Sequence, residues 1–151
     1  MGLHIWVDAD ACPKLAKEIL FRAADKRQVP VTLVANQYLK TPPSQYISAV
    51  QVPQGFDVAD NEIVARLAPG DLVVTADIPL ADEVITKGGA AISPRGAIYT
   101  RDNIKDILSR RDLMETLRDS GMVSGGPDTY AKKDVLGFAN ALDRYITLHT
   151  K

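Results

Sequence analysis

Apolar runs alternate with amphipathic stretches along the first hundred residues. Residues 4–8, 29–35 and 71–77 are dominated by apolar side chains, which is typical of strands buried on both faces of a parallel sheet. Residues 13–26 and 57–67 lie between these runs and carry apolar side chains at helical spacing. This alternation of strand and helix predicts an α/β fold with a mainly parallel central sheet.

Shorter extended segments complete the expected sheet. Residues 47–52 resume an extended pattern after a proline-containing stretch, and residues 90–93 and 97–99 have the pattern of short edge strands. Between them Pro79 opens a further helix, which closes at the glycine pair 88–89,. We expect a central sheet of about five strands within a three-layer sandwich.

The last third of the chain has a different pattern. Residues 104–117 and 135–146 carry apolar side chains at helical spacing, so two amphipathic helices are expected to close the chain. The glycine-rich stretch 124–133 joins them and is long enough to suggest a functional loop such as a lid. We therefore predict a single domain, with the core sheet and its helices in residues 1–100 and the two closing helices in residues 101–151.

Composition narrows the class of protein. The 151 residues are 46% hydrophobic and 25% charged, which is ordinary for a soluble globular protein. A formal net charge of -1 argues against a broad basic surface for nucleic acid. The single cysteine, Cys12, excludes an internal disulfide and a cysteine-only zinc site, and it is typical of a reducing compartment, so a cytoplasmic location is expected. No membrane or export segment is expected, because Asp8 interrupts the N-terminal apolar run after a few residues,.

Carboxylates follow two of the buried strands. Asp8 and Asp10 come at the end of the first run, and Asp77 ends the run at 71–77. Because the carboxyl ends of parallel strands meet at one edge, where open α/β sheets bind ligands, these side chains are expected to meet there. Asp60 and Asp82 lie in the first turns of neighbouring helices and could face the same edge. So many carboxylates would repel one another unless a divalent ion neutralised them, which predicts hydrated Mg²⁺ or Mn²⁺.

Such an ion would activate water and stabilise an in-line phosphoryl displacement. Asp8 and Asp77 are the strongest catalytic candidates, because both follow buried strands. Other roles stay open for the remaining acids. Asp10 can instead satisfy free N–H groups at the start of the following helix, and Asp60 and Asp82 can be solvated first-turn acids.

Cationic and aromatic residues supply candidate contacts to RNA. Lys132 and Lys133 follow Tyr130 in the glycine-rich stretch, and an aromatic platform beside cations suits a single strand. Arg95 and Arg101 lie beside a glycine turn, where guanidinium groups could hold phosphate. In both places an ordinary solvated loop is the alternative interpretation.

Several segments together carry a resemblance to a known family. They are residues 5–13, 55–60, 70–81, 94–96 and 138–143. The set resembles the uncharacterised bacterial YaiI/YqxD family, and the resemblance spans nearly the whole chain. That family is grouped with the PIN-like and NYN-type domains, whose fold is a parallel α/β sheet and whose active members are metal-dependent ribonucleases.

The resemblance also implies roles for individual acids. Asp8 matches the first-strand acid of PIN-like nucleases, Asp60 matches their mid-chain acid, and Asp77 with Asp82 matches the later pair. Asp10 has no certain counterpart in that pattern. What the resemblance implies is a metal-dependent ribonuclease that hydrolyses RNA phosphodiester bonds with Mg²⁺ or Mn²⁺.

Two other functions remain open at this point. A haloacid-dehalogenase-like phosphatase also presents an Asp-x-Asp pair after an apolar strand. Pro13 starts a helix at once, however, and leaves no room for the flap that such enzymes insert there. A non-catalytic RNA-binding module that has lost turnover is the third possibility, since neither net charge nor aromatic content separates it from a nuclease.

Overall fold

Six strands form one central sheet in the computed structural model, which describes residues 3–55, 57–119 and 130–149. Their spatial order is β3-β2-β1-β4-β5-β6, and every neighbouring pair is parallel except β5 and β6. The strands are β1 (Ile5–Asp8), β2 (Val31–Ala35), β3 (Ile47–Gln51), β4 (Leu72–Val74), β5 (Ala90–Ile92) and β6 (Ile98–Tyr99). The expected parallel sheet is confirmed, and the sixth strand is the antiparallel β6 at its edge.

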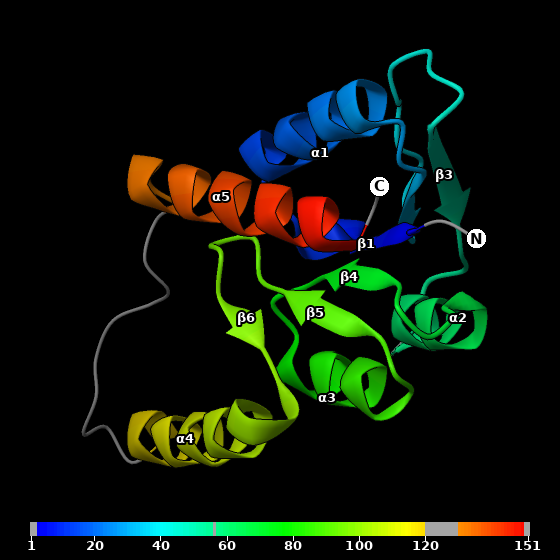
Figure 1. Cartoon of the computed structure of the whole chain (residues 1–151). Coiled ribbons are helices and arrows are strands. Elements are labelled where there is room, and N and C mark those ends of the chain that lie inside the picture. Colours follow the sequence, from blue (N-terminus) through cyan, green and yellow to red (C-terminus); the bar gives the residue numbers. More distant parts are fainter. Residues whose placement is uncertain (1–2, 56, 120–129, 150–151) are drawn as a thin grey trace.

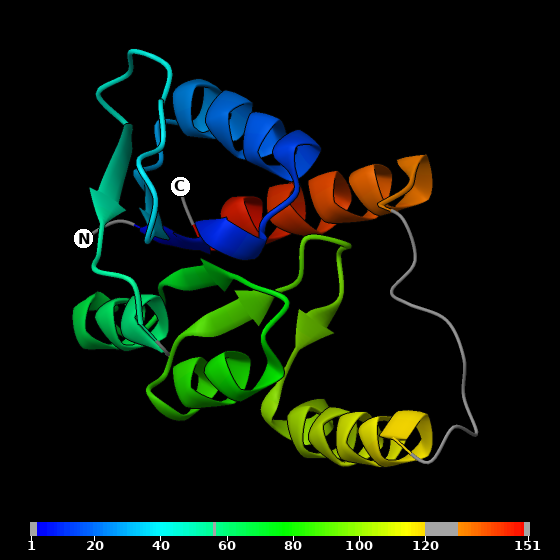
Figure 2. The same ribbon diagram turned by 180° about the vertical axis from the view of Figure 1, so that it is seen from behind.

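Helices cover both faces of this sheet, as Figure 1 shows. The α-helices are α1 (Lys14–Arg27), α2 (Val58–Arg66), α3 (Ile78–Thr86), α4 (Arg101–Asp119) and α5 (Lys132–His149). On one face α1 packs beside α5, and on the other α2 and α3 lie side by side with α4 packed on α3 (Figures 1 and 2). This is the expected three-layer sandwich. The two closing helices do not form a pair, because α4 and α5 lie on opposite faces.

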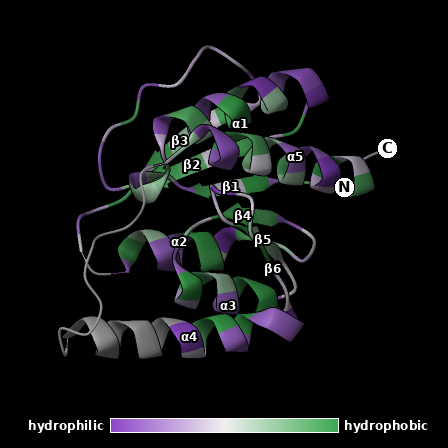
Figure 3. Cartoon of the chain, turned by 90° about the vertical axis from the view of Figure 1, so that its left-hand side faces the viewer, coloured by the Kyte–Doolittle hydropathy of each residue, from purple (hydrophilic) through white to green (hydrophobic). Residues whose placement is uncertain are grey.

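Two hydrophobic cores lie above and below the sheet. Successive strand residues point to opposite faces, so Ile5 and Val7 join the core under α1 and α5, while Trp6 joins the core under α2 and α3. Figure 3 shows hydrophobic residues gathered in the strands and on the helix sides that face them. By the same alternation Asp8, the next residue of β1, belongs on the α2–α3 face. That placement decides which helices supply its neighbours.

A close backbone contact ties the turn between β5 and β6 to α5. Gly96 has a φ of +95°, and a Cβ there would lie 2.5 Å from the carbonyl carbon of Gly137 in α5. A Cβ on Gly137 would in turn lie 2.9 Å from the carbonyl oxygen of Arg95. Only glycine satisfies both the left-handed backbone and the close approach. The contact holds Arg95 next to the beginning of α5.

The glycine-rich stretch predicted as a lid lies mostly outside the described residues, which resume at Tyr130. No helix in the part of the chain that the structure describes is long and apolar enough to cross a membrane.

Helix boundaries agree closely with the sequence pattern. The helix predicted from residue 13 begins at Lys14, with Pro13 in the N-cap position.

Candidate functional site

Asp8 and Asp77 meet at the carboxyl edge of the sheet. Asp8, which is only 8% exposed, accepts a hydrogen bond of 2.9 Å from Thr75 Oγ1. The same Thr75 oxygen accepts the backbone N–H of Asp77 at 2.9 Å. Asp77 then caps α3, because its Oδ1 accepts the N–H of Leu80 at 3.1 Å. The structure therefore joins the two strongest catalytic candidates through one hydroxyl group.

Asp60, in the first turn of α2, completes a group of three carboxylates that we call the acidic cluster. Burial, followed by the negative charges of Asp77, Asp8 and Asp57, raises the pKa of Asp60 from its ordinary value to about 7. A hydrogen bond between the Asp60 and Asp77 carboxyl groups contributes to the same shift. Carboxylates that share one site raise each other's proton affinity in this way.

The pKa of Asp8 is raised as well. Burial is the largest cause, and the charges of Asp77 and Asp10 add to it, while the hydrogen bond from Thr75 lowers it. A carboxylate that is desolvated and faces other carboxylates is stabilised by any bound cation. The acidic cluster thus concentrates negative charge at one end of the sheet.

A cavity of about 350 Å³ opens in front of α2 and α3 at this edge. We call it the acidic cavity, and its lining residues are Asp57, Asp60, Asn61, Asp77, Pro79, Leu80 and Glu83. All four of its titratable lining groups are acids. The cavity therefore suits a cation, or a cation together with the phosphate that it neutralises.

The donor set fits a hydrated divalent cation better than a closed protein cage. Among residues 3–55, 57–119 and 130–149, no three His, Cys, Asp or Glu side chains lie close enough together to hold a metal ion as they stand. Asp60 and Asp77 nevertheless lie within hydrogen-bonding reach of each other. Mg²⁺ commonly binds through one or two carboxylates and keeps several waters. A hydrated ion at this pair, with Asp8 beside it, is the arrangement that these residues fit.

Asp10 and Asp82 are not brought into the acidic cluster. The chain leaves β1 through a 3-10 turn, η1 (Ala9–Ala11), so Asp8 is buried whereas Asp10 is exposed, and the two carboxylates do not form an extended pair. Asp10 accepts the N–H of Asn36 at 2.8 Å in the loop after β2. No side-chain hydrogen bond caps α1, so Asp10 does not fill the helix-start role considered for it either.

Asp82 lines a separate cavity between α3 and α4, together with Arg101 and Lys105. The physical reason is helical geometry. Asp82 lies five residues beyond Asp77, which is about 140° further around the helix axis at 3.6 residues per turn. The structure therefore separates Asp82 and Arg101 from the acidic cluster.

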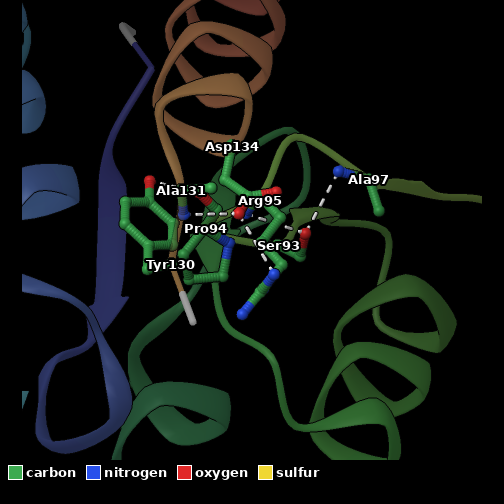
Figure 4. Close-up of polar contacts among 7 residues, drawn as sticks. All are labelled: Ser93, Pro94, Arg95, Ala97, Tyr130, Ala131 and Asp134. Atoms are coloured by element: carbon green, nitrogen blue, oxygen red, sulfur yellow. Dashed lines mark hydrogen bonds and ion pairs between the residues drawn. The ribbon is translucent and has the colours of Figure 1, made fainter. Parts of the chain in front are cut away.

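Arg95 and Tyr130, two of the candidate RNA contacts, come together (Figure 4). The Arg95 guanidinium carbon lies 5.9 Å from the centroid of the Tyr130 ring. Arg95 Nη1 also pairs with Asp134 Oδ2 at 3.1 Å, at the beginning of α5. Lys132 and Lys133 are exposed in the first turn of the same helix. Four of the five predicted contacts thus lie around one end of α5.

Sequence reasoning missed the role of Thr75. Its hydroxyl links Asp8 to Asp77, and the available signal was a hydroxyl residue two positions before an acid at the end of a strand. Cys12 has the surroundings of a packed residue. Its side chain is buried, and burial raises the pKa of the thiol to about 12, which disfavours a thiolate nucleophile.

The fold and the site together define an α/β domain with a mainly parallel sheet and an acidic carboxyl edge. The chain belongs to the YaiI/YqxD family, because residues 6–148 match the family described as "Uncharacterized BCR, YaiI/YqxD family". It is 60% identical over 149 residues to the UPF0178 protein of Shewanella woodyi, a match that covers 99% of each chain. It is 58% identical over 144 residues to the UPF0178 protein of Janthinobacterium sp., covering 95% of each. No solved structure matches the chain.

Proposed function

We propose that the protein is a metal-dependent ribonuclease that hydrolyses RNA phosphodiester bonds with Mg²⁺ or Mn²⁺ at the acidic cluster. The observation that carries this proposal is that Asp8, Asp60 and Asp77 lie together at the carboxyl edge of the sheet, where burial and the charges of Asp77 and Asp8 raise the pKa of Asp60 to about 7. Retaining three mutually repelling carboxylates at a ligand-binding edge costs stability. A divalent cation would relieve that cost.

Each carboxylate has a distinct part in the proposed reaction. Asp60 and Asp77 hold the hydrated ion, which when bound would activate water and stabilise the charge developing on the phosphoryl oxygens. Asp8 is oriented by the Thr75 hydroxyl group. With its raised pKa it is suited to accept a hydrogen bond from the attacking water and to position it,.

The geometry offers less support for the phosphatase alternative. That reaction needs Asp8 and Asp10 as a self-contained pair of nucleophile and acid, whereas η1 separates a buried Asp8 from an exposed Asp10. The helix α1 follows at Lys14, so no flap is inserted after the pair. The non-catalytic RNA-binding module would use the same edge without turnover, and the experiment below distinguishes it.

The test is cleavage of labelled single-stranded RNA, with a generic phosphomonoester assayed in parallel, in Mg²⁺, in Mn²⁺ and in chelator. The parent chain is compared with Asp8→Asn, Asp60→Asn and Asp77→Asn. Asp82→Asn is the matched control, since Asp82 lies on α3 but lines the other cavity. We expect metal-dependent RNA cleavage that the three cluster variants lose and the control keeps.

Three results would contradict the proposal. Cleavage that survives chelation, or survives both Asp8→Asn and Asp77→Asn, rules out hydrolysis at the acidic cluster. Turnover of the monoester through a trapped aspartyl-phosphate favours the phosphatase. Binding of RNA without cleavage under either metal favours the non-catalytic module.

A further inference from the structure

A second hollow, of about 450 Å³, adjoins the acidic cavity. Its volume lies within the range of about 300–1,000 Å³ that is usual for small-molecule sites. Ala76 lines this hollow, and the next residue, Asp77, lines the acidic cavity. Because consecutive Cα atoms are about 3.8 Å apart, the two hollows share a wall. We call the second hollow the Tyr130 cleft, after the aromatic residue that lines it.

The Tyr130 cleft has a mainly apolar lining. Ser93, Pro94 and Tyr99 are buried and form its inner part, whereas Ala11 and Ala97 are exposed and approach from two different segments, η1 and the turn between β5 and β6. The Ser93 oxygen is already occupied, since it accepts two backbone N–H groups of its own turn. Such a surface makes few polar demands on its occupant, which suits the apolar face of a flat aromatic ring.

Tyr130 and Arg95 are held in position beside this lining, as Figure 4 shows. The Tyr130 hydroxyl donates to the carbonyl oxygen of Pro94 at 2.7 Å, which fixes the ring. The carboxylate of Asp134 pairs with Arg95 and also accepts the N–H of Ala131 at 2.8 Å. The cleft therefore offers an aromatic ring and a planar cation that are ordered before any ligand arrives.

We propose that the Tyr130 cleft binds one nucleobase of a single-stranded nucleic acid whose adjoining phosphate lies at the acidic cavity. The position of the phosphate rests on the proposed function, whereas binding of the base does not. Unpaired bases stack on aromatic rings and on guanidinium planes, largely independently of their sequence. Bases inside a duplex are paired and stacked on each other, so the cleft selects unpaired nucleotides.

The inference can be tested without phosphate, metal or turnover. The full chain, ¹⁵N-labelled and in chelator, is titrated by NMR with adenosine and, at equal concentration, with ribose. Adenosine is expected to shift the backbone amides of Ser93, Arg95 and Tyr130 saturably, whereas ribose leaves them unchanged. The shifts report base binding at the cleft, because neither ligand carries a phosphate for the acidic cavity.

Two variants fill the cleft from different segments, Ala97→Phe from the turn between β5 and β6 and Ala11→Phe from η1. Each is expected to weaken adenosine binding about tenfold or more, the effect of losing one base-stacking contact. The matched control is Ala68→Phe, at another exposed alanine, which lines neither hollow and lies beside Asp71 at the opposite edge of the sheet. It should bind adenosine as the parent does. Thermal midpoints confirm that each variant is folded.

Several outcomes overturn the inference. They are the absence of adenosine binding, equal shifts with ribose, and parental adenosine affinity in either filled variant that is folded. Saturable binding of N-acetyl-tryptophanamide in place of adenosine would assign the cleft to an aromatic peptide side chain. Failure of the two proposals is distinguishable. Adenosine binding without any RNA hydrolysis contradicts only the ribonuclease, and RNA hydrolysis without adenosine binding contradicts only the base-binding cleft.

Discussion

The two edges of the central sheet both carry buried aspartates, but the partners of these aspartates differ. At the amino edge, Asp71 is 7% exposed and accepts the indole N–H of Trp6 at 3.1 Å and the backbone N–H of Ala68 at 2.9 Å. At the carboxyl edge, Asp8 is almost as buried but has the Thr75 hydroxyl and the charges of other carboxylates around it. Asp71 therefore has donors around it, whereas Asp8 accepts one hydroxyl group and otherwise faces other carboxylates.

The difference follows from the direction of the backbone. Free N–H groups point outward at the amino ends of parallel strands, so a carboxylate there finds donors and stabilises the fold. At the carboxyl ends, donors come mainly from the beginnings of the following helices. One such donor, the N–H of Leu80, is already used by the cap of Asp77. The acidic cluster therefore keeps negative charge that few protein donors offset, and this is the charge that the proposed cation would neutralise.

The largest expected effect is on RNA cleavage, which should depend on the carboxyl edge and not on the amino edge. Asp77→Asn is expected to lower metal-dependent RNA cleavage by about 100-fold or more, since a lost metal ligand forfeits several kcal/mol of charge stabilisation. Asparagine can still cap α3, so the thermal midpoint should stay near that of the parent. Initial rates in Mn²⁺ and thermal melts measure the two effects. Asp71→Asn, at the other edge, should leave the cleavage rate of the folded protein unchanged.

The second expected effect is on the free energy of unfolding, which should depend more on Asp71 at the amino edge than on Asp8 at the carboxyl edge. Asp71→Ala leaves the buried indole N–H of Trp6 and the N–H of Ala68 without an acceptor. It should cost about 3 kcal/mol, because a buried donor left without an acceptor costs about 1–3 kcal/mol and the partly buried N–H of Ala68 loses its partner as well. Denaturant melts give the free energy of unfolding. Equal destabilisation by Asp8→Ala would show that the two edges do not differ in this way.

The third prediction compares two glycines with left-handed backbones. Gly96→Ala combines a φ of +95° with a Cβ that would lie 2.5 Å from Gly137, and it should cost about 2 kcal/mol,. Gly70→Ala, at the amino edge, has a φ of +91° but nothing within 4 Å of its Cβ. It should therefore cost only the backbone strain, about 1 kcal/mol. If melts gave equal losses, the contact between the β5–β6 turn and α5 would not stabilise the fold.

The smallest effect is a pH dependence at the acidic cluster. The pKa of Asp60 rises to about 7 in the folded chain, so its contribution to stability is present below about pH 4 and is lost as the pH rises through 7. Because asparagine carries no charge at any of these pH values, Asp60→Asn removes this loss of stability at high pH. Because Asp60 is only partly buried and solvent screens its charge, we expect a gain of about 1 kcal/mol at pH 8, or roughly 2–4 °C in thermal midpoint.

The control for this pH series is Asp82→Asn, on α3 but outside the acidic cavity. Melts at pH 4 and at pH 8 are compared for the parent and both variants. At pH 4 the midpoint of Asp60→Asn should equal that of the parent. A gain at pH 8 that the control also shows would contradict the coupling of Asp60 to its neighbours.

The sequence pattern was most informative where burial is uniform along an element. β1, β2 and β4 are buried at every position, so their apolar runs predicted a parallel sheet and the meeting of Asp8 with Asp77 at its edge. It was least informative at residues whose direction depends on a turn. The 3-10 turn η1 leaves Asp10 exposed, and the helical phase of α3 carries Asp82 away from the acidic cluster.

The sequence by itself determined the α/β class, the order of the main elements and the edge at which the acids of two strands meet. These features depend on local periodicity, which short stretches of chain carry. Only the tertiary structure decided that Asp60 joins Asp8 and Asp77, that Thr75 links them, and that Arg95 reaches Tyr130. Those contacts join residues distant in the chain, so they depend on how helices pack on the sheet, which no local pattern specifies.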